Sequence, residues 1–198
     1  MRVIGGRFRG FTLKAPAGDR IRPTADRVRE AVFNMLAGDV YGAVVVDLFA
    51  GTGAMGLEAL SRGASHCSFV DISLLACRTV RENIERLGVG EMCVVVRADV
   101  SSFLQRPVED DLLGGCGLVF ADPPYDSGFP VDVVRQLGRW PGLAPGARLV
   151  VESEARRVPA AQEGEVLVDG VTVDRKRRYG DTAVIILRYP GRRTVADV

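Results

Sequence analysis

One short loop combines an acid, two prolines and an aromatic residue: Asp122-Pro123-Pro124-Tyr125, directly after the apolar run at 118–121. Proline lacks a backbone N–H and has a fixed φ, so this loop offers carbonyl and carboxylate acceptors in a rigid frame. The exocyclic amine of a nucleobase is a poor nucleophile because its lone pair is delocalised into the ring. Acceptors on both N–H bonds would draw it toward tetrahedral geometry, and Tyr125 would stack on a flipped base. We predict that Asp122, Pro123 and Tyr125 are catalytic.

A glycine-rich loop at 47–56, Asp-Leu-Phe-Ala-Gly-Thr-Gly-Ala-Met-Gly, forms the second candidate site. It contains G-x-G-x-x-G, and Asp71 follows at the end of the next apolar run, as in dinucleotide-binding folds. Glycine allows the backbone to approach a ligand without a Cβ in the way. NAD and S-adenosylmethionine are the two candidate ligands. The carboxylate of Asp47 would repel a pyrophosphate but suit an ammonium group, and no dehydrogenase-like proton donor is visible, so the pattern favours S-adenosylmethionine.

Two further acids complete the predicted cofactor site. Asp71 would accept hydrogen bonds from the ribose hydroxyls, and Asp99 would accept from the adenine amine. Asp99 also suits an N-cap of the following helix, and the two roles are compatible. The predicted cofactor-binding residues are Asp47, Phe49, Gly51, Thr52, Gly53, Asp71, Ile72, Asp99 and Val100.

The elements that must position these residues alternate along the chain. Apolar runs at 44–49, 67–70, 93–96, 118–121 and 149–151 are separated by helical patterns at 55–61, 74–87, 100–105 and 131–140. This alternation predicts βαβ units and a Rossmann-like, doubly wound parallel sheet. The last runs, 166–173 and 182–187, have only a basic turn between them, which predicts a closing antiparallel hairpin. The pattern at 1–14 predicts a small N-terminal β-hairpin with a turn at Gly5-Gly6.

Charge is distributed unevenly. Residues 1–36 carry eight basic and three acidic side chains, and 175–198 carry seven and two, so each end has a charge of +5. Because the whole chain is +1, residues 37–174 carry −9. This indicates a neutral or cationic ligand in the middle and an anionic partner at the ends, unless the charge runs are only solvated surface. The predicted RNA-binding residues are Arg2, Arg7, Arg9, Arg22, Arg175, Lys176, Arg177 and Arg178.

Length and composition indicate the domain organisation and limit the expected membrane segments and metal sites. The 198 residues, 47% apolar, predict one globular domain with a hairpin extension (1–20), a catalytic core (21–189) and a flexible tail (190–198). No run approaches a membrane span and no signal peptide is visible, which predicts a cytoplasmic protein. The four cysteines form no C-x-x-C pair and His66 is the single histidine, so no metal site is expected. A monomer is expected.

Nearly the whole chain resembles the class I S-adenosylmethionine-dependent methyltransferases, specifically the bacterial 16S ribosomal RNA guanine-N2 methyltransferases of the RsmD type. The glycine and Asp-Pro-Pro-Tyr motifs are common to many amino-group methyltransferases, whereas the N-terminal segment and the closing Tyr-Gly-Asp-Thr narrow the resemblance. Residues 109–117 match nothing and are given no role. The segments that carry the resemblance are 1–14, Arg22-Pro23-Thr24 with Arg29-Glu30, 47–53, 57–64, 122–125 and 178–182.

The resemblance implies a seven-stranded, mostly parallel sheet, methyl donation by S-adenosylmethionine, and a guanine of 16S rRNA within an assembling small subunit as acceptor. The residues alone leave adenine N6, cytosine N4 and guanine N2 open, because all three amines present the same two hydrogens. A DNA or RNA adenine-N6 methyltransferase and a protein-amide methyltransferase are alternatives, the second usually with Asn in place of Asp122. A non-catalytic RNA-binding module is another, although it has no need of the glycine loop.

Overall fold

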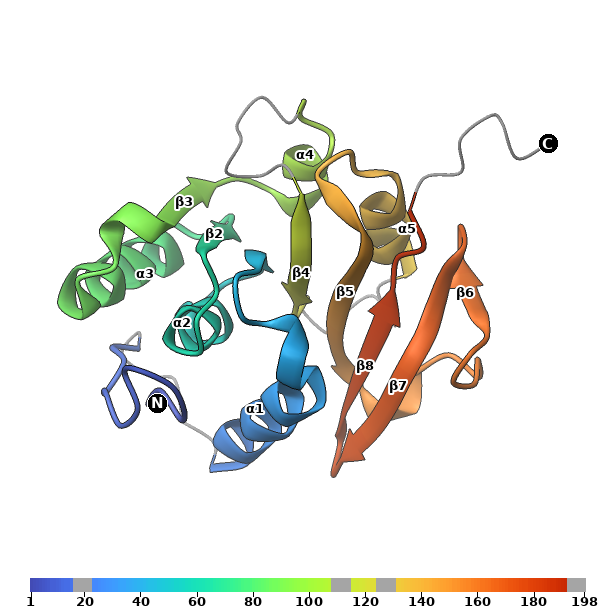
Figure 1. The fold of residues 1–198 in the computed structure, drawn as a ribbon, viewed down its shortest axis with the longest axis horizontal. Coiled ribbons are helices and arrows are strands. Elements are labelled where there is room, and N and C mark those ends of the chain that lie inside the picture. The colour runs from blue at the N-terminus through green and yellow to red at the C-terminus, as the bar shows by residue number, and fades with distance from the viewer. Residues whose placement is uncertain (16–22, 108–114, 124–130, 192–198) are drawn as a thin grey trace.

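The computed structural model describes residues 1–15, 23–107, 115–123 and 131–191, and these form one mixed sheet with helices on both faces (Figure 1). The strand order is β3-β2-β1-β4-β5-β8-β7-β6. The strands β1 to β5 pair in parallel, and β5–β8, β8–β7 and β7–β6 pair antiparallel. The Rossmann-like prediction with an antiparallel C-terminal hairpin is therefore confirmed. The strands are β1 Val44–Leu48, β2 His66–Asp71, β3 Cys93–Arg97, β4 Cys116–Ala121, β5 Leu143–Glu154, β6 Val166–Val168, β7 Val171–Tyr179 and β8 Thr182–Arg188.

The sheet separates two apolar cores, and each core is covered by its own set of helices. The helices α1, α2 and α3 pack on one face of the sheet, and α4 and α5 pack on the other. Because side chains alternate along a strand, Val45 of β1 joins the first core and Val46 the second. Asp47 therefore lies on the face covered by α1 to α3. The helices are α1 Pro23–Leu36, α2 Ala54–Ser61, α3 Leu74–Leu87, α4 Val100–Leu104 and α5 Val131–Arg139, with single 3₁₀ turns at Ala37–Asp39, Gly90–Met92 and Ala155–Arg157.

The C-terminal part differs from the seven-stranded prediction. The expected strand at 166–173 is broken by a tight turn at Asp169 and Gly170, whose φ angles are +47° and +81°. A two-residue turn with both φ angles positive matches the twist of a hairpin. The expected single strand is therefore two antiparallel strands, β6 and β7, and the sheet has eight strands in place of seven. The basic residues 175–178 consequently lie within β7 and not in a turn. The turn between β7 and β8 is formed by Gly180 and Asp181.

The N-terminal segment also departs from a regular hairpin. Its two arms share a single antiparallel bridge, Arg2 to Thr12. Between them, the backbone of residues 4–8 bonds to α2 instead of pairing with itself. Val3 and Leu13 are buried in the core that α1 to α3 share. The segment is therefore attached to the sheet domain through α2, and it lies beside α1 in Figure 1.

Two further predictions concern the whole chain. Among the helices described, none is long and apolar enough to cross a bilayer. Within the same described ranges, no group of three or more His, Cys, Asp or Glu side chains is arranged to hold a metal ion. Residues 192–198 of the predicted tail lie outside the described part of the chain.

Candidate active site

A cavity of about 580 Å³ opens at the carboxyl ends of the central strands. In an open α/β sheet this edge is where ligands bind. Its walls come from the glycine loop after β1, from α1, from the ends of β4 and β5, and from the turn between β7 and β8. Of the predicted site residues, this cavity brings together Asp47, Phe49, Gly51, Thr52 and Asp122.

The glycines of the loop have different roles. Gly51 adopts φ +54°, and a Cβ placed there would have only the Phe49 carbonyl within 4 Å, so its open side is available to a ligand. Gly53 adopts φ +76°, and its Cβ would press on Phe69 and Val80 at 3.2 Å. A Cβ on Gly56 would collide with Phe69 at 2.4 Å. A side chain at Gly51 would face open space, whereas the absence of one at Gly53 and Gly56 allows the close packing of α2 on β2, and the cofactor-binding role of Gly53 stays a prediction.

Phe49 lies in the left-handed region, with φ +58°. A bulky residue rarely adopts this conformation, which costs of the order of 1–3 kcal/mol and persists only where the surroundings impose it. Here the neighbouring Ala50 N–H donates to the Val70 carbonyl at 3.1 Å, which ties the turn to β2. The strained turn presents Phe49, Gly51 and Thr52 to the cavity.

Asp47 is a buried carboxyl group at the floor of the cavity, with 3% of its surface exposed. The Gly56 N–H donates to its Oδ2 at 2.9 Å. The pKa of Asp47 is raised to about 8; burial is the main cause, the Gly56 hydrogen bond opposes it, and the nearby charges of Asp122 and Asp71 contribute to the rise. A bound cation would reverse this shift, so the site suits a positively charged ligand.

Asp71 fixes the geometry of two loops at once. Its Oδ2 accepts from the Gly51 N–H at 2.9 Å, and its Oδ1 accepts from the Ser73 N–H at 2.8 Å. Its backbone carbonyl accepts from the Ala98 N–H at 3.1 Å, which joins the ends of β2 and β3. Ile72 beside it is exposed, with 66% of its surface open.

Asp99 has the capping role that was one of its two predicted functions, since its Oδ2 accepts from the Ser102 N–H at 3.0 Å at the start of α4. Val100, the first residue of α4, is buried. Asp71, Ile72, Asp99, Val100 and Gly53 do not line the cavity itself. Asp71 ends β2 and contacts the glycine loop through Gly51, Ile72 follows it, and Asp99 and Val100 begin α4 after the end of β3.

Asp122 follows β4 directly and lines the cavity. Its side chain is exposed at the cavity, and partial desolvation by the surrounding protein raises the pKa of its carboxyl to about 6. Pro123 is described, whereas Pro124 and Tyr125 lie outside the described residues, so the predicted stacking stays a prediction. Glu152, which follows the apolar run of β5 and lines the same cavity, was not among the predicted site residues. Its position at the carboxyl end of a parallel strand was the available signal.

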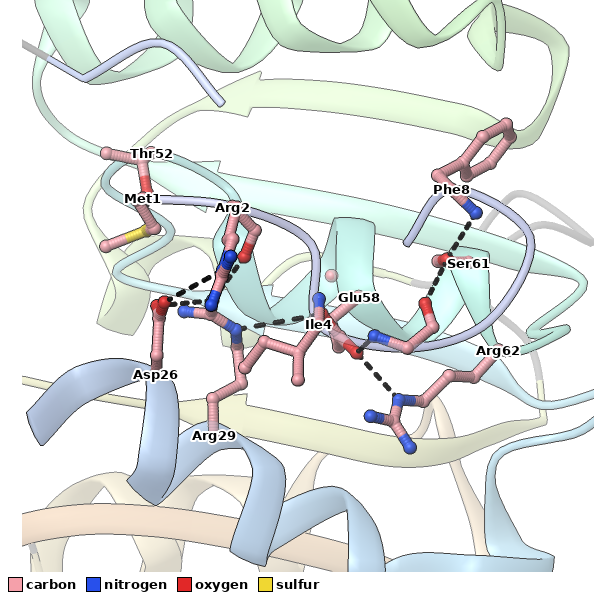
Figure 2. A network of polar contacts seen from close by, with 12 residues as sticks. Met1, Arg2, Ile4, Phe8, Asp26, Arg29, Thr52, Glu58, Ser61 and Arg62 are labelled. Atoms are coloured by element: carbon pink, nitrogen blue, oxygen red, sulfur yellow. Dashed lines mark hydrogen bonds and ion pairs between the residues drawn. The ribbon is translucent and has the colours of Figure 1, made fainter. Parts of the chain in front are cut away.

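Glu58 on α2 holds the N-terminal segment in place (Figure 2). This fully buried carboxylate accepts from the backbone N–H groups of Ile4 at 2.7 Å and Gly5 at 2.8 Å, and from Arg62 Nε at 2.7 Å. Arg29 of α1 lies within 3.8 Å of the same carboxylate and also donates to the Arg2 carbonyl. Through this network, the N-terminal segment becomes part of the cavity wall, which Met1 and Arg29 line.

The predicted RNA-binding residues fall into two groups. Arg7 and Arg9 are exposed on the N-terminal segment, and the Arg7 guanidinium lies 5.1 Å from the centre of the Phe8 ring. Arg22 lies outside the described residues. The others each have a protein partner: Arg2 Nε lies 3.7 Å from Asp26, Arg175 Nε 3.9 Å from Asp174, Lys176 Nζ 2.8 Å from the Pro159 carbonyl, Arg177 Nη1 2.7 Å from Glu163, and Arg178 Nε 2.8 Å from the Gly180 carbonyl.

Comparison with known proteins agrees with this geometry. The family model described as Conserved hypothetical protein 95 matches residues 1–188. The chain is 36% identical over 191 residues to YlbH, a candidate rRNA methyltransferase of Bacillus subtilis, covering 96% of this chain and 100% of that protein. It is also 36% identical over 154 residues to the ribosomal RNA small subunit methyltransferase D of Escherichia coli K12, covering 78% of this chain and 75% of that protein.

A solved methyltransferase structure is also similar to this chain. The candidate methyltransferase yhhF from Escherichia coli is 32% identical to this chain, with a TM-score of 0.80, and the match covers 97% of this chain and 99% of that chain. The resemblance stated from the sequence motifs is thereby confirmed. The chain belongs to the Conserved hypothetical protein 95 family of methyltransferases, together with the ribosomal RNA small subunit methyltransferase D proteins.

Proposed function

We propose that this protein transfers a methyl group from S-adenosylmethionine to the N2 amine of a guanine in 16S ribosomal RNA. The main observation in support of the proposal is that Asp122 lines the same cavity as Asp47 and the glycine loop. Membership of a family that includes ribosomal RNA small subunit methyltransferase D supports the choice of acceptor. Such an enzyme would act in the cytoplasm, on an assembling small subunit and as a monomer.

The residues present fit the cofactor. Asp47 is buried and close to other acids, so it favours a ligand with an ammonium group and a sulfonium. Gly51 has open space where a side chain would otherwise stand, Asp71 ends β2, and Asp99 caps α4 two residues after the end of β3. When bound there, S-adenosylmethionine supplies an electrophilic methyl group. Ile72 would cover the adenine ring, since it is a large apolar side chain exposed beside Asp71.

The chain's own groups then orient the acceptor. The Asp122 carboxylate and the Pro123 carbonyl would accept the two N–H bonds of the amine, which localises its lone pair and directs it at the methyl group. The Asp122 carboxylate would also receive the proton that the amine must lose as the N–C bond forms and the S–CH3 bond of the cofactor breaks. Such pre-oriented acceptors stabilise the charge that develops in the transition state.

Labelled S-adenosylmethionine with purified small subunits, naked 16S rRNA, genomic DNA and protein extract tests this proposal. We expect label in the RNA arms, and mass spectrometry of the digested product should identify N2-methylguanosine. N6-methyladenosine in RNA or DNA would instead indicate an adenine methyltransferase. Binding of RNA without transfer of label would indicate a non-catalytic RNA-binding protein.

A further inference from the structure

Two acidic residues end neighbouring strands in the cavity. The parallel register pairs Phe120 with Val150 and Ala121 with Val151, so Asp122 and Glu152 are the next neighbours along β4 and β5. Adjacent strands lie about 5 Å apart. Both acids share the sheet face of Phe120 and Val150, which also line the cavity. The two carboxyl groups are therefore presented side by side to one ligand.

Glu152 has no evident structural task. Within the ranges that the structure describes, neither its carboxyl nor that of Asp122 accepts a hydrogen bond. Burial and the charge of Asp122 raise the pKa of Glu152 to about 7, whereas the charge of Arg29 lowers it. Arg29 is itself held by the Arg2 carbonyl and by Asp26 Oδ1 at 3.0 Å. Glu152 is half-buried and Asp122 is exposed at the cavity, so both carboxyl groups are accessible to a hydrogen-bond donor on a ligand.

We propose that Glu152 selects guanine among the amino bases by accepting the ring N1–H, while Asp122 accepts from the neighbouring N2 amine. This inference rests on the proposed function, because it assumes that the amine of a base enters this cavity. Guanine carries a ring N–H next to its amine. Adenine and cytosine carry a ring nitrogen acceptor in the corresponding position, which Glu152 repels in its ionised form, the dominant form above its pKa of about 7. A second acid beside Asp122 therefore distinguishes bases whose amines are alike.

A base analogue tests this inference directly. The methylated guanosine is first located by mass spectrometry, and the RNA is then made with guanosine or 2-aminopurine riboside at that position. 2-Aminopurine keeps the amine but has a ring acceptor in place of the N1–H. The unmodified enzyme should prefer guanosine by about 100-fold or more in kcat/KM, because sites built around a hydrogen bond strongly reject analogues that lack it.

The variant Glu152→Gln supplies the second arm. Its amide can donate to the ring nitrogen of 2-aminopurine or accept from guanine N1–H, so we expect the preference to fall below about tenfold. Glu154→Gln is the matched control on the same strand, since Glu154 pairs with Arg156 at 2.7 Å and does not line the cavity. Calorimetric binding of S-adenosylmethionine checks that both variants retain the folded cofactor site.

The outcomes separate this inference from the proposed function. Equal use of guanosine and 2-aminopurine by the unmodified enzyme would overturn the role of Glu152, even with N2-methylguanosine as the product. An undiminished guanosine preference in Glu152→Gln would overturn it as well. If the product is N6-methyladenosine or N4-methylcytidine, the proposed function fails first, and the guanine-selecting role of Glu152 fails with it.

Discussion

Replacing Asp47 with asparagine should stabilise the ligand-free protein while weakening cofactor binding. The pKa of Asp47 rises from 3.8 to about 8 on folding. A group with a raised pKa contributes stability that is fully present below pH 3.8 and is lost as the pH rises toward 8. At pH 7, Asp47 is protonated in the folded protein but ionised in the unfolded chain. Because each pH unit above 3.8 costs about 1.4 kcal/mol, this difference lowers the free energy of unfolding by up to about 4 kcal/mol.

Asparagine removes this cost because it does not titrate, and its Oδ1 can still accept from the Gly56 N–H. The free energy of unfolding of Asp47→Asn, relative to the unmodified protein, should therefore increase by roughly 1 kcal/mol per pH unit between pH 5 and 8. Urea denaturation at several pH values measures this difference. Asp132→Asn is the control, since the Asp132 side chain is 84% exposed and should give a flat difference.

Cofactor binding should change in the opposite direction. Loss of a charged partner for an ammonium group costs about 1.5–3 kcal/mol, so calorimetry should show S-adenosylmethionine affinity reduced by roughly 10- to 100-fold in Asp47→Asn. A pH-independent stability difference between the two proteins would refute the reasoning about burial. Unchanged cofactor affinity would refute the assignment of Asp47 to the cofactor.

Three other predictions follow from the geometry. Asp122→Ala should lower kcat by roughly 100-fold or more while cofactor affinity stays near normal, and a retained single-turnover rate would exclude the amine-orienting role. Gly6→Ala should lower thermal stability by at least about 2 kcal/mol, because its Cβ would lie 1.9 Å from the carbonyl oxygen of the last residue of α2. Gly10→Ala, with a similar φ but open space, is its control and should cost clearly less. Neutral replacement of Arg7 and of Arg9 should each make the slope of log K against log salt shallower by about 0.7–0.9 for RNA, and an unchanged slope would assign them to solvated surface.

Local sequence determined the elements and their order. The buried β-branched run at 44–48 predicts β1, and the residues at the ends of α3 delimit it: Ser73 caps the first turn and Gly88 adopts φ +66° after the last. Asp47 and Asp122 were identified as site residues because each stands where a predicted strand meets its loop. Such signals involve residues a few positions apart, so they are readable from a single chain.

Only the tertiary structure showed which distant groups meet. Glu58 binds the backbone of Ile4, 54 residues away, and this contact docks the N-terminal segment on α2 while backbone hydrogen bonds such as Leu13 N–H to the Met1 carbonyl still join its two arms. Likewise, only the fold shows that side chains at Gly53 and Gly56 would meet Phe69 of β2.

The basic residues and the second acid of the cavity give the same lesson. The sequence determined that 175–178 are basic, but only the fold placed them in β7, where Arg177 pairs with Glu163. In the sequence, nothing distinguishes Glu152 from the other acidic residues. The register of β4 and β5 places it beside Asp122. Composition and periodicity record what each residue is, whereas pairing between strands distant in sequence decides which charges share one cavity.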